Sequence, residues 1–433
     1  MINNNTKMLC VSPSKVAGTI AIPPSKSQTL RAILFGSVAH GKSTIENILE
    51  SPDSNAMIAA CRNLGAEIAH SRDCAIIDGI SGSFTGANDV IDAGNSGLVL
   101  RFMSAIGALG NRPVVITGDH SIRHNRPMND LLNGLEQLGC RTETLCANGY
   151  APVVIKGPIQ AGNAQIIGRD SQPVSALLMA AALSKGTYKI HVSDPGEKPW
   201  VDLTLQWLNK LGISYTNDAY HQYMIKGHGT IDAINYRVPG DLSSCAFPLA
   251  AAIITHSTLT IENVDLSDSQ GDKKLFDILR LMGANIEENP SKQQLIVRGN
   301  TPLKGIQIDI NDCIDAIVIL SVIACYAKGT TVITNAAIAR NKECDRITAI
   351  AKELKKMGAK IEEHCDGLTI KESNLQGAEV WSHHDHRMAM ALAISALGAC
   401  GTTTIRDTTC IAKTYPCFVQ DFTSIGATIE VLP

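Results

Sequence analysis

The chain has 433 residues, more than the roughly 250–300 at which single hydrophobic cores stop growing, so we expect two domains. Aromatic residues make up only 4% and the formal net charge is −3, which disfavours nucleic-acid binding. The thirteen cysteines are scattered, without a CxxC pair or a zinc-like spacing, and favour a reducing, cytoplasmic location.

The N-terminal segment MINNNTKMLC is polar and lacks the charged-then-apolar layout of a signal peptide. The longest apolar run, residues 316–327, is shorter than the roughly 20 residues that cross a bilayer. We therefore expect a soluble protein without membrane association.

Two interleaved sets of motifs repeat six times along the chain. In the first set, an amphipathic stretch precedes a glycine and a strand-like segment, and successive glycines are 74, 73, 71, 75 and 68 residues apart. These glycines are Gly65, Gly139, Gly212, Gly283, Gly358 and Gly426. In the second set, an apolar helix precedes a strand, with a marker at Gly41, Gly110, Gly186, Ser257, Gly329 and Gly401. Repeats of this length favour two threefold domains over a solenoid, whose repeats are usually about 20–50 residues long.

The first helix of each repeat is predicted to start at a polar segment. Ser, Asn and Asp at these starts are explained by helix capping. Lys26 and Arg387 are not, because a cation beside the positive end of a helix dipole is unfavourable unless an anion binds there. We therefore expect anion-binding faces where helices start together. The six starts are Lys26-Ser27, Asn95-Ser96-Gly97, Asp170-Ser171-Gln172, Asp241-Leu242-Ser243, Asp315 and Asp385-His386-Arg387.

Two other motifs are misleading. Residues 36–43, GSVAHGKS, match the P-loop pattern, but a helix is predicted before them and a strand after them, the reverse of a phosphate-cradling loop. This segment therefore predicts a helix-to-strand turn. Residues 383–387, HHDHR, include histidine and aspartate, which are common metal ligands. Side chains of adjacent residues rarely point toward one ion, so we do not expect a metal site here.

Nine polar segments carry a family resemblance when taken in order. They are PPSKSQTLR (23–31), GNSGLVLR (94–101), NRPM (125–128), DSQPVSALLMA (170–180), KPWVD (198–202), IDA (314–316), NKECDR (341–346), DHRMAMA (385–391) and AKTYP (412–416). With them the chain resembles the 5-enolpyruvylshikimate-3-phosphate synthase family from about residue 16 to residue 418. The resemblance implies an α/β fold, a two-domain inside-out α/β barrel of six βαβαββ repeats. It also implies that residues 1–24 group with residues 243–433, and that residues 25–242 form the other domain.

The same resemblance implies an enzyme of chorismate and aromatic amino acid biosynthesis. Such an enzyme transfers the enolpyruvyl group of phosphoenolpyruvate to the 5-hydroxyl of shikimate 3-phosphate and releases phosphate. It uses no cofactor and no metal, and its partners are these small-molecule substrates, which its two domains close upon. We expect a monomer, because the two domains supply the cleft themselves.

Phosphoenolpyruvate carries a phosphate and a carboxylate, so its site needs several cations, and arginine offers a bidentate fork. By resemblance, this site contains Lys26, Asn95, Gly97, Arg126, Gln172, Arg346, His386, Arg387 and Lys413. The site of shikimate 3-phosphate contains Lys26, Ser27, Arg31, Ser171, Gln172, Trp200, Asp315 and Lys342.

The reaction needs one proton removed from the attacking hydroxyl and another delivered to the vinyl carbon. By resemblance, Asp315 orients and deprotonates the hydroxyl, while Glu343 and Lys26 handle the other proton transfers. Both carboxylates argue against the alternative of a non-catalytic small-molecule-binding relative, since a binder needs only the cations.

The chain departs from the family pattern near the acceptor phosphate, where Asp170 and Glu197 stand in place of serines found in many members. Two acids repel a dianion unless cations compensate, and Arg169, Lys198 and Arg340 are adjacent candidates. An acceptor without phosphate, such as another cyclitol, therefore remains an alternative. UDP-N-acetylglucosamine is a further alternative acceptor. The enolpyruvyl transferases that use it resemble this chain less, because they have Lys-Asn where this chain has Lys26-Ser27. They also usually have a reactive cysteine near position 115, where this chain has none.

The segment after Gly97 is also atypical, with Leu98 where a threonine is common and Phe102 where a proline is common. Bulkier apolar residues behind Gly97 are expected to shift its backbone toward the phosphoenolpyruvate pocket. We therefore expect weakened inhibition by glyphosate, which is thought to occupy that pocket.

Overall fold

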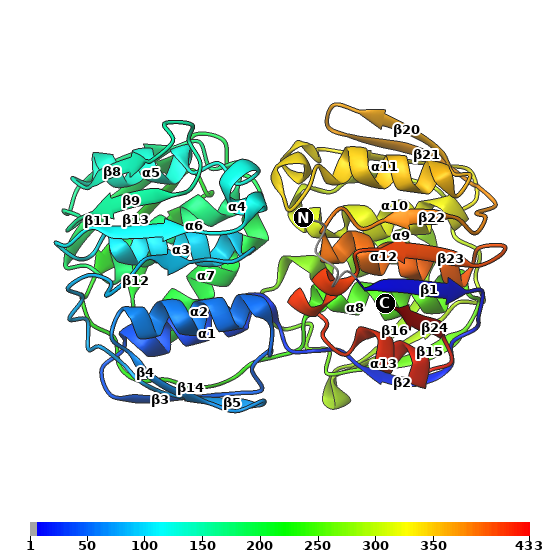
Figure 1. Cartoon of the computed structure of the whole chain (residues 1–433), viewed down its shortest axis with the longest axis horizontal. Coiled ribbons are helices and arrows are strands. Elements are labelled where there is room, and N and C mark those ends of the chain that lie inside the picture. The colour runs from blue at the N-terminus through cyan, green and yellow to red at the C-terminus, as the bar shows by residue number, and fades with distance from the viewer. Residues whose placement is uncertain (1–6) are drawn as a thin grey trace. The chain divides into compact units, whose positions relative to one another are not determined.

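The computed structural model describes residues 7–433 and divides into two compact units (Figure 1). Unit 1 contains the described chain up to Pro23, together with Pro239–Asp268 and Asp272–Pro433. Unit 2 contains Pro24–Val238 and Ser269–Gly271. The sequence placed the borders after residues 24 and 242, and residues 1–6 of the first predicted segment lie outside the described residues.

The strands of unit 2 form three four-stranded sheets. The strands are β3 (Lys42–Glu46), β4 (Glu67–His70), β5 (Cys74–Asp78), β6 (Ile91–Asp92), β7 (Val114–Thr117), β8 (Arg141–Thr144), β9 (Val153–Lys156), β10 (Asn163–Ile166), β11 (Gly186–Val192), β12 (Ser214–Asp218), β13 (Gln222–Gly227) and β14 (Asn235–Arg237). The sheet orders are β14-β3-β5-β4, β6-β7-β9-β8 and β10-β11-β13-β12. In each sheet the first pair is parallel and the other two pairs are antiparallel.

Unit 1 repeats this arrangement. Its strands are β1 (Met8–Ser12), β2 (Gly18–Ala21), β15 (Thr258–Glu262), β16 (Asn285–Asn289), β17 (Gln294–Arg298), β18 (Gln307–Asp309), β19 (Thr330–Thr334), β20 (Lys360–His364), β21 (Gly367–Lys371), β22 (Glu379–Trp381), β23 (Thr403–Arg406) and β24 (Thr428–Leu432). The sheet orders are β2-β15-β17-β16, β18-β19-β21-β20 and β22-β23-β1-β24. Strand β1 lies between β23 and β24, so the N-terminal segment completes the last sheet (Figure 1).

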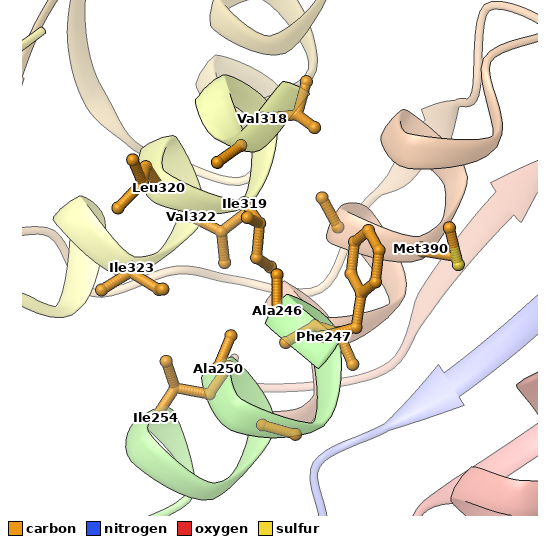
Figure 2. Close-up of a cluster of buried hydrophobic side chains, with 14 of the residues drawn as sticks. Ala246, Phe247, Ala250, Ile254, Val318, Ile319, Leu320, Val322, Ile323 and Met390 are labelled. Carbon is orange, nitrogen blue, oxygen red and sulfur yellow. The ribbon is translucent and has the colours of Figure 1, made fainter. Parts of the chain in front are cut away.

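Six long helices form the cores of the two units. They are α1 (Lys26–Val38), α3 (Gly97–Gly107) and α6 (Ser171–Ala182) in unit 2, and α8 (Leu242–Ile254), α10 (Ile317–Tyr326) and α12 (His386–Leu397) in unit 1. Nearly all their residues are buried, as expected for helices that are apolar on every side. In unit 1, α8, α10 and α12 pack against one another, and Phe247, Ile319 and Met390 lie in their shared cluster (Figure 2).

A second set of helices follows the second strand of each repeat. These are α2 (Pro52–Asn63), α5 (Asn129–Gln137), α7 (Lys198–Lys210), α9 (Lys274–Met282), α11 (Arg346–Lys356) and α13 (Phe418–Ser424), with a short α4 (His120–His124) before α5. The six repeated glycines of the first motif set lie at or just after the ends of these helices with φ between 70° and 105°. This left-handed conformation is common at helix C-termini and strongly favours glycine, which explains why the motif repeats.

The order within each repeat is βαβαββ, as the family resemblance implied. Three repeats draw a strand from a distant part of the chain: β14 opens the repeat of α1, β2 opens the repeat of α8, and β1 closes the repeat of α12. The turn predicted for the P-loop-like segment is confirmed, because α1 ends at Val38 and β3 starts at Lys42. Among residues 7–433, no helix combines the length and apolar character needed to span a membrane.

Candidate active site

Capped first turns open five of the six central helices. Side-chain oxygens of the residue before each helix accept a hydrogen bond from a backbone N–H of the first turn. These caps are Ser25, Ser96, Asp170, Asp241 and Asp385. The start of α10 differs, because Asp315 lies in the preceding 3₁₀ turn, Asn311–Ala316, and its carboxylate pairs with arginines.

In unit 1, Arg346 at the start of α11 contacts three carboxylates. Its Nε donates to Asp385 at 2.7 Å, its Nη1 to Asp315 at 2.7 Å and its Nη2 to Glu343 at 2.8 Å. Burial lowers the pKa of the Arg346 guanidinium, but these carboxylates raise it well above its ordinary value. Arg346 is therefore a permanent cation that holds three acids in place.

Two further cations extend this cluster. Lys413 donates through Nζ to Oε1 of Glu343 at 2.7 Å, and Arg387 donates through Nη2 to Oδ2 of Asp315 at 2.9 Å. Glu343 and Asp315 thus each bridge Arg346 and a second cation. We call the connected residues Lys413, Glu343, Arg346, Asp315 and Arg387 the ion-pair chain. All five were predicted as site residues from the sequence, and the structure brings them together.

The carboxylate of Asp315 is strongly influenced by its neighbours. Burial raises its pKa, but the positive charges of Arg387, Arg346 and Lys342 lower the pKa by more than burial raises it. The net shift of the Asp315 pKa is therefore downward. Asp315 is consequently ionised at neutral pH. Its side chain is 22% exposed, whereas that of Arg346 is 1% exposed, so the carboxylate is the accessible partner of the pair.

Asp272 is a buried acid of unit 1 that was not predicted from the sequence. It accepts a hydrogen bond from the hydroxyl of Ser243 in the first turn of α8. Burial raises its pKa from 3.8 to about 7, although the nearby charge of Arg387 lowers it. Its segment, QGDK, resembles an ordinary turn, so no local signal distinguishes it.

The three histidines of the HHDHR segment face different partners. His383 Nε2 lies 2.9 Å from Glu353, and His384 pairs with Asp407. His386 opens α12, where its Nδ1 lies 3.7 Å from Asp385. Within the described residues, no group of three or more His, Cys, Asp or Glu side chains is arranged to hold a metal ion.

In unit 2, Arg101 of α3 is a fully buried cation that was not singled out in the sequence. Its Nη2 lies 3.1 Å from Oδ2 of Asp170 and donates to the backbone oxygen of Pro127 at 3.1 Å. Its Nη1 donates to the side-chain oxygen of Gln172 at 3.1 Å. Burial lowers the pKa of Arg101, and the charge of Asp170 opposes this shift. Arg101 therefore joins the start of α6 to the NRPM segment.

Gly97, the first residue of α3, lies against these groups. A Cβ atom placed there would lie 3.1 Å from Nη1 of Arg101, 3.2 Å from Oε1 of Gln172 and 3.7 Å from Cζ of Arg126. The predicted residues Gly97, Arg126 and Gln172 therefore converge within unit 2. Asn95, just before this helix, donates to Asp119 at 2.6 Å. A Cβ atom at Gly97 would therefore require small shifts of the Arg101 and Gln172 side chains.

The remaining predicted residues of unit 2 lie on α1, α6 and α7. Lys26 Nζ lies 3.5 Å from Asp53. Arg31 donates to the backbone oxygen of Ser27 at 3.2 Å and to Thr204 at 2.9 Å, and its guanidinium lies 4.9 Å from the ring centroid of Phe102. The predicted Trp200 lies in the first turn of α7.

The two acids that depart from the family pattern have defined partners. Asp170 caps α6 by accepting from the N–H of Gln172 at 3.0 Å, and it pairs with Arg101. Glu197 accepts from both the N–H and the hydroxyl of Ser171, each at 3.0 Å. The first turn of α6 therefore already holds two carboxylates.

The cations proposed to compensate these acids have other contacts. Arg169 pairs with Asp194 at the surface, and Arg340 pairs with Asp345. Lys198 lies 5.6 Å from the ring centroid of Tyr220. Compensation for Asp170 instead comes from Arg101, a residue distant in sequence.

Comparison with known proteins identifies the family. The family EPSP synthase (3-phosphoshikimate 1-carboxyvinyltransferase) matches residues 11–422. A 3-phosphoshikimate 1-carboxyvinyltransferase from Chlamydia caviae is 41% identical over 97% of this chain and 94% of its own length. One from Acetivibrio thermocellus is 40% identical over 98% of this chain and 99% of its own length.

Solved structures agree. EPSP synthase from Acinetobacter baumannii has a TM-score of 0.82 at 28% identity and covers 99% of this chain and 100% of that chain. The enolpyruvyl transferase NikO from Streptomyces tendae, at 17% identity and a TM-score of 0.80, shares the fold over 99% of both chains.

The fold is thus that of the enolpyruvyl transferases, as predicted. The chain belongs to the EPSP synthase (3-phosphoshikimate 1-carboxyvinyltransferase) family. It is an enzyme of the shikimate pathway that transfers an enolpyruvyl group, which confirms the activity inferred from the nine polar segments.

Proposed function

We propose that the chain transfers the enolpyruvyl group of phosphoenolpyruvate to the 5-hydroxyl of shikimate 3-phosphate and releases phosphate. The observation that carries this proposal is the ion-pair chain, in which Asp315 and Glu343 are held among three cations. An anion-binding protein needs only the cations. Addition and elimination at phosphoenolpyruvate need both cations and two proton-transferring groups.

The cations of the ion-pair chain are proposed to bind phosphoenolpyruvate. Arg346, Arg387 and Lys413 present donors whose partners in the free protein are carboxylates. An incoming phosphate or carboxylate takes over some of these hydrogen bonds, so binding is an exchange of one anion for another. Prepositioned donors stabilise developing negative charge without reorganisation. The residues assigned to the same substrate by resemblance are Lys26, Asn95, Gly97, Arg126, Gln172 and His386.

Asp315 is the proposed base for the 5-hydroxyl. Its low pKa in the free protein makes it a weak base, because Arg387 and Arg346 stabilise its ionised form. When substrate anions engage these arginines, that stabilisation weakens and the pKa of Asp315 rises. Substrate binding therefore activates the base. The hydroxyl oxygen then bonds to the second carbon of phosphoenolpyruvate as Asp315 takes its proton.

Glu343 and Lys26 are the proposed groups for the remaining proton transfers. One proton is added to the methylene carbon in the addition step and one is removed from the resulting methyl group as phosphate leaves. Glu343 is bound on both sides, by Arg346 at 2.8 Å and by Lys413 at 2.7 Å. This fixed position supports a role in transfer at one carbon atom.

The acceptor residues are proposed as the resemblance assigned them. Ser27 and Arg31 bind the ring carboxylate, Gln172 and Trp200 contact the ring, and Ser171 and Lys342 bind the phosphate. Lys26 and Asp315 complete the set. The contacts of Arg31 with Thr204 and Phe102 support this role, because a guanidinium fixed by packing binds a carboxylate with little loss of side-chain entropy.

The chain is further proposed to act as a cytoplasmic monomer. All thirteen cysteines are free, which supports a reducing compartment. Size-exclusion chromatography with light scattering at micromolar concentration distinguishes a 46.2 kDa monomer from a dimer.

The proposed reaction is tested by measuring phosphate release from phosphoenolpyruvate with three acceptors in parallel. Shikimate 3-phosphate is expected to support turnover, and unphosphorylated shikimate and UDP-N-acetylglucosamine are not. Turnover with either of the latter two, and none with shikimate 3-phosphate, would replace this assignment with the corresponding alternative acceptor.

A further inference from the structure

Glu197 occupies the hydrogen-bond donors at the start of α6. Its Oε2 accepts from the backbone N–H and from the hydroxyl of Ser171, both at 3.0 Å, and the Glu197 side chain is buried. Ser171 is the first helical residue, so this carboxylate lies where the helix dipole and the unsatisfied N–H groups favour an anion. The first turn of α6 is thus an anion site filled by the protein itself.

The backbone holds Glu197 in this position under strain. Its φ of 47° and ψ of 41° are left-handed, a conformation that few residues other than glycine adopt. The neighbouring Gly196 packs so closely that a Cβ atom there would lie 2.4 Å from the backbone oxygen of Arg169. The residue with this unusual backbone conformation is thus the one whose carboxylate contacts Ser171.

The carboxylate of Glu197 does not cap α7. Glu197 is the residue before α7, but its side chain makes no capping hydrogen bond to that helix. The backbone contact that joins it to the helix, from the N–H of Trp200 to its carbonyl oxygen, is independent of the carboxylate. Capping of α7 therefore does not depend on the Glu197 carboxylate.

We propose that Glu197 is a specificity-determining residue that competes with the acceptor's phosphate for the donors of Ser171. This inference rests on the proposed function, which places that phosphate at Ser171. A carboxylate and a phosphate dianion cannot share one N–H and one hydroxyl, because like charges at contact distance repel strongly in a buried site. The phosphate binds by displacing the carboxylate of Glu197, and acceptor affinity is reduced accordingly.

The test is the dissociation constant of shikimate 3-phosphate, measured by titration calorimetry on the full chain without phosphoenolpyruvate. Glu197→Gln removes the charge at constant size, and Glu197→Ser removes both charge and bulk. Both variants are expected to bind shikimate 3-phosphate at least tenfold more tightly than the parent chain. The matched control is Glu143→Ser, which removes an exposed acid from β8 in the same unit and is expected to leave the constant unchanged.

Unchanged or weaker binding in both Glu197 variants overturns the proposal. Tighter binding by Glu197→Gln together with weaker binding by Glu197→Ser also overturns it. That result would mean that the side chain at position 197 stays in the site and contacts the ligand, and is not displaced by it. Circular dichroism and urea unfolding establish that each variant is folded. If either variant fails to fold, a crystal structure of the parent chain with bound shikimate 3-phosphate tests the proposal instead. The proposal predicts that the Glu197 carboxylate no longer contacts Ser171 in that structure, and a retained contact overturns it.

Failure of this inference is distinguishable from failure of the proposed function. If the parent chain releases phosphate with shikimate 3-phosphate but the Glu197 variants bind it no more tightly, only the competition is wrong. If the parent chain shows no turnover with shikimate 3-phosphate, the proposed function itself is wrong.

Discussion

Arg346 and Asp315 form an ion pair in which Nη1 lies 2.7 Å from Oδ1. The pair joins the turn before α10 to the first residue of α11. Arg346 is buried and Asp315 is partly exposed, so a ligand that reaches the pair meets the carboxylate first. The arginine positions the acid, and the acid is the group available to a substrate.

Arg346→Lys is expected to lower kcat/KM for phosphoenolpyruvate about 100-fold. A lysine keeps the positive charge, but its single nitrogen cannot replace the three separate donors that contact Asp385, Asp315 and Glu343. Steady-state phosphate release measures the effect. The control is Arg340→Lys, which alters an arginine paired with Asp345 in the same unit. Equal losses in both variants would contradict a specific role for Arg346.

Asp272 is expected to make the protein less stable as pH rises. Its pKa is raised to about 7 in the folded chain and is 3.8 ordinarily, so between these values the folded state binds more protons than the unfolded state. The free energy of unfolding therefore falls from about pH 4 to pH 7 through this group and stays lowered above pH 7.

Asp272→Asn removes this dependence. The variant is expected to match the parent chain near pH 4 and to exceed it by up to about 4 kcal/mol at pH 7.5, because the neutral amide needs no ionisation. Urea unfolding at both pH values measures the difference. If the variant is less stable than the parent at pH 7.5, the ionised carboxylate of Asp272 is instead stabilised by the charge of Arg387.

Arg101 and Asp170 are expected to be energetically coupled. Arg101→Gln leaves a partly buried carboxylate without its guanidinium and should cost about 3–5 kcal/mol of unfolding free energy. Asp170→Asn retains a capping residue and should cost less. A double-mutant cycle by urea unfolding should give a coupling energy of about 1–3 kcal/mol. Additive effects would mean that the pair contributes nothing specific.

Weak inhibition by glyphosate is expected from the residues behind Gly97. Leu98 packs against the core of unit 2, and the Phe102 ring lies under the guanidinium of Arg31. Leu98→Thr is expected to lower the inhibition constant of glyphosate several-fold with a smaller change in KM for phosphoenolpyruvate. Competitive inhibition of the parent chain at the level of a typical sensitive enzyme would refute this expectation.

Local patterns account for the part of the fold that was predictable from sequence. The repeated glycines mark left-handed helix ends, and the polar starts mark capped first turns, so both leave a signal within a few residues. The family resemblance supplied the return of the N-terminal strand. Residue patterns alone do not reveal that β1 pairs with β23 and β24, because pairing between distant strands leaves no local signal.

The contacts that were not predicted all join distant segments. Arg101 pairs with Asp170 across two repeats, Glu197 reaches back to Ser171, and Asp272 accepts from Ser243. Each involves a buried or partly buried acid whose partner is chosen by packing. Sequence identified Asp170 and Glu197 as unusual, but it assigned their compensation to adjacent cations, whereas the structure places a buried arginine and a serine beside them.

We propose that the ion-pair chain supports enolpyruvyl transfer with Asp315 as the base. The most direct measurement compares kcat for phosphate release, at saturating phosphoenolpyruvate and shikimate 3-phosphate, in Asp315→Asn and in Asp312→Asn, an exposed acid of the same turn. We predict a loss of about 10²–10⁴-fold for Asp315→Asn and no change for Asp312→Asn. A kcat for Asp315→Asn within about threefold of the parent value would show that Asp315 is not the general base, because removing such a base costs about 10²-fold or more.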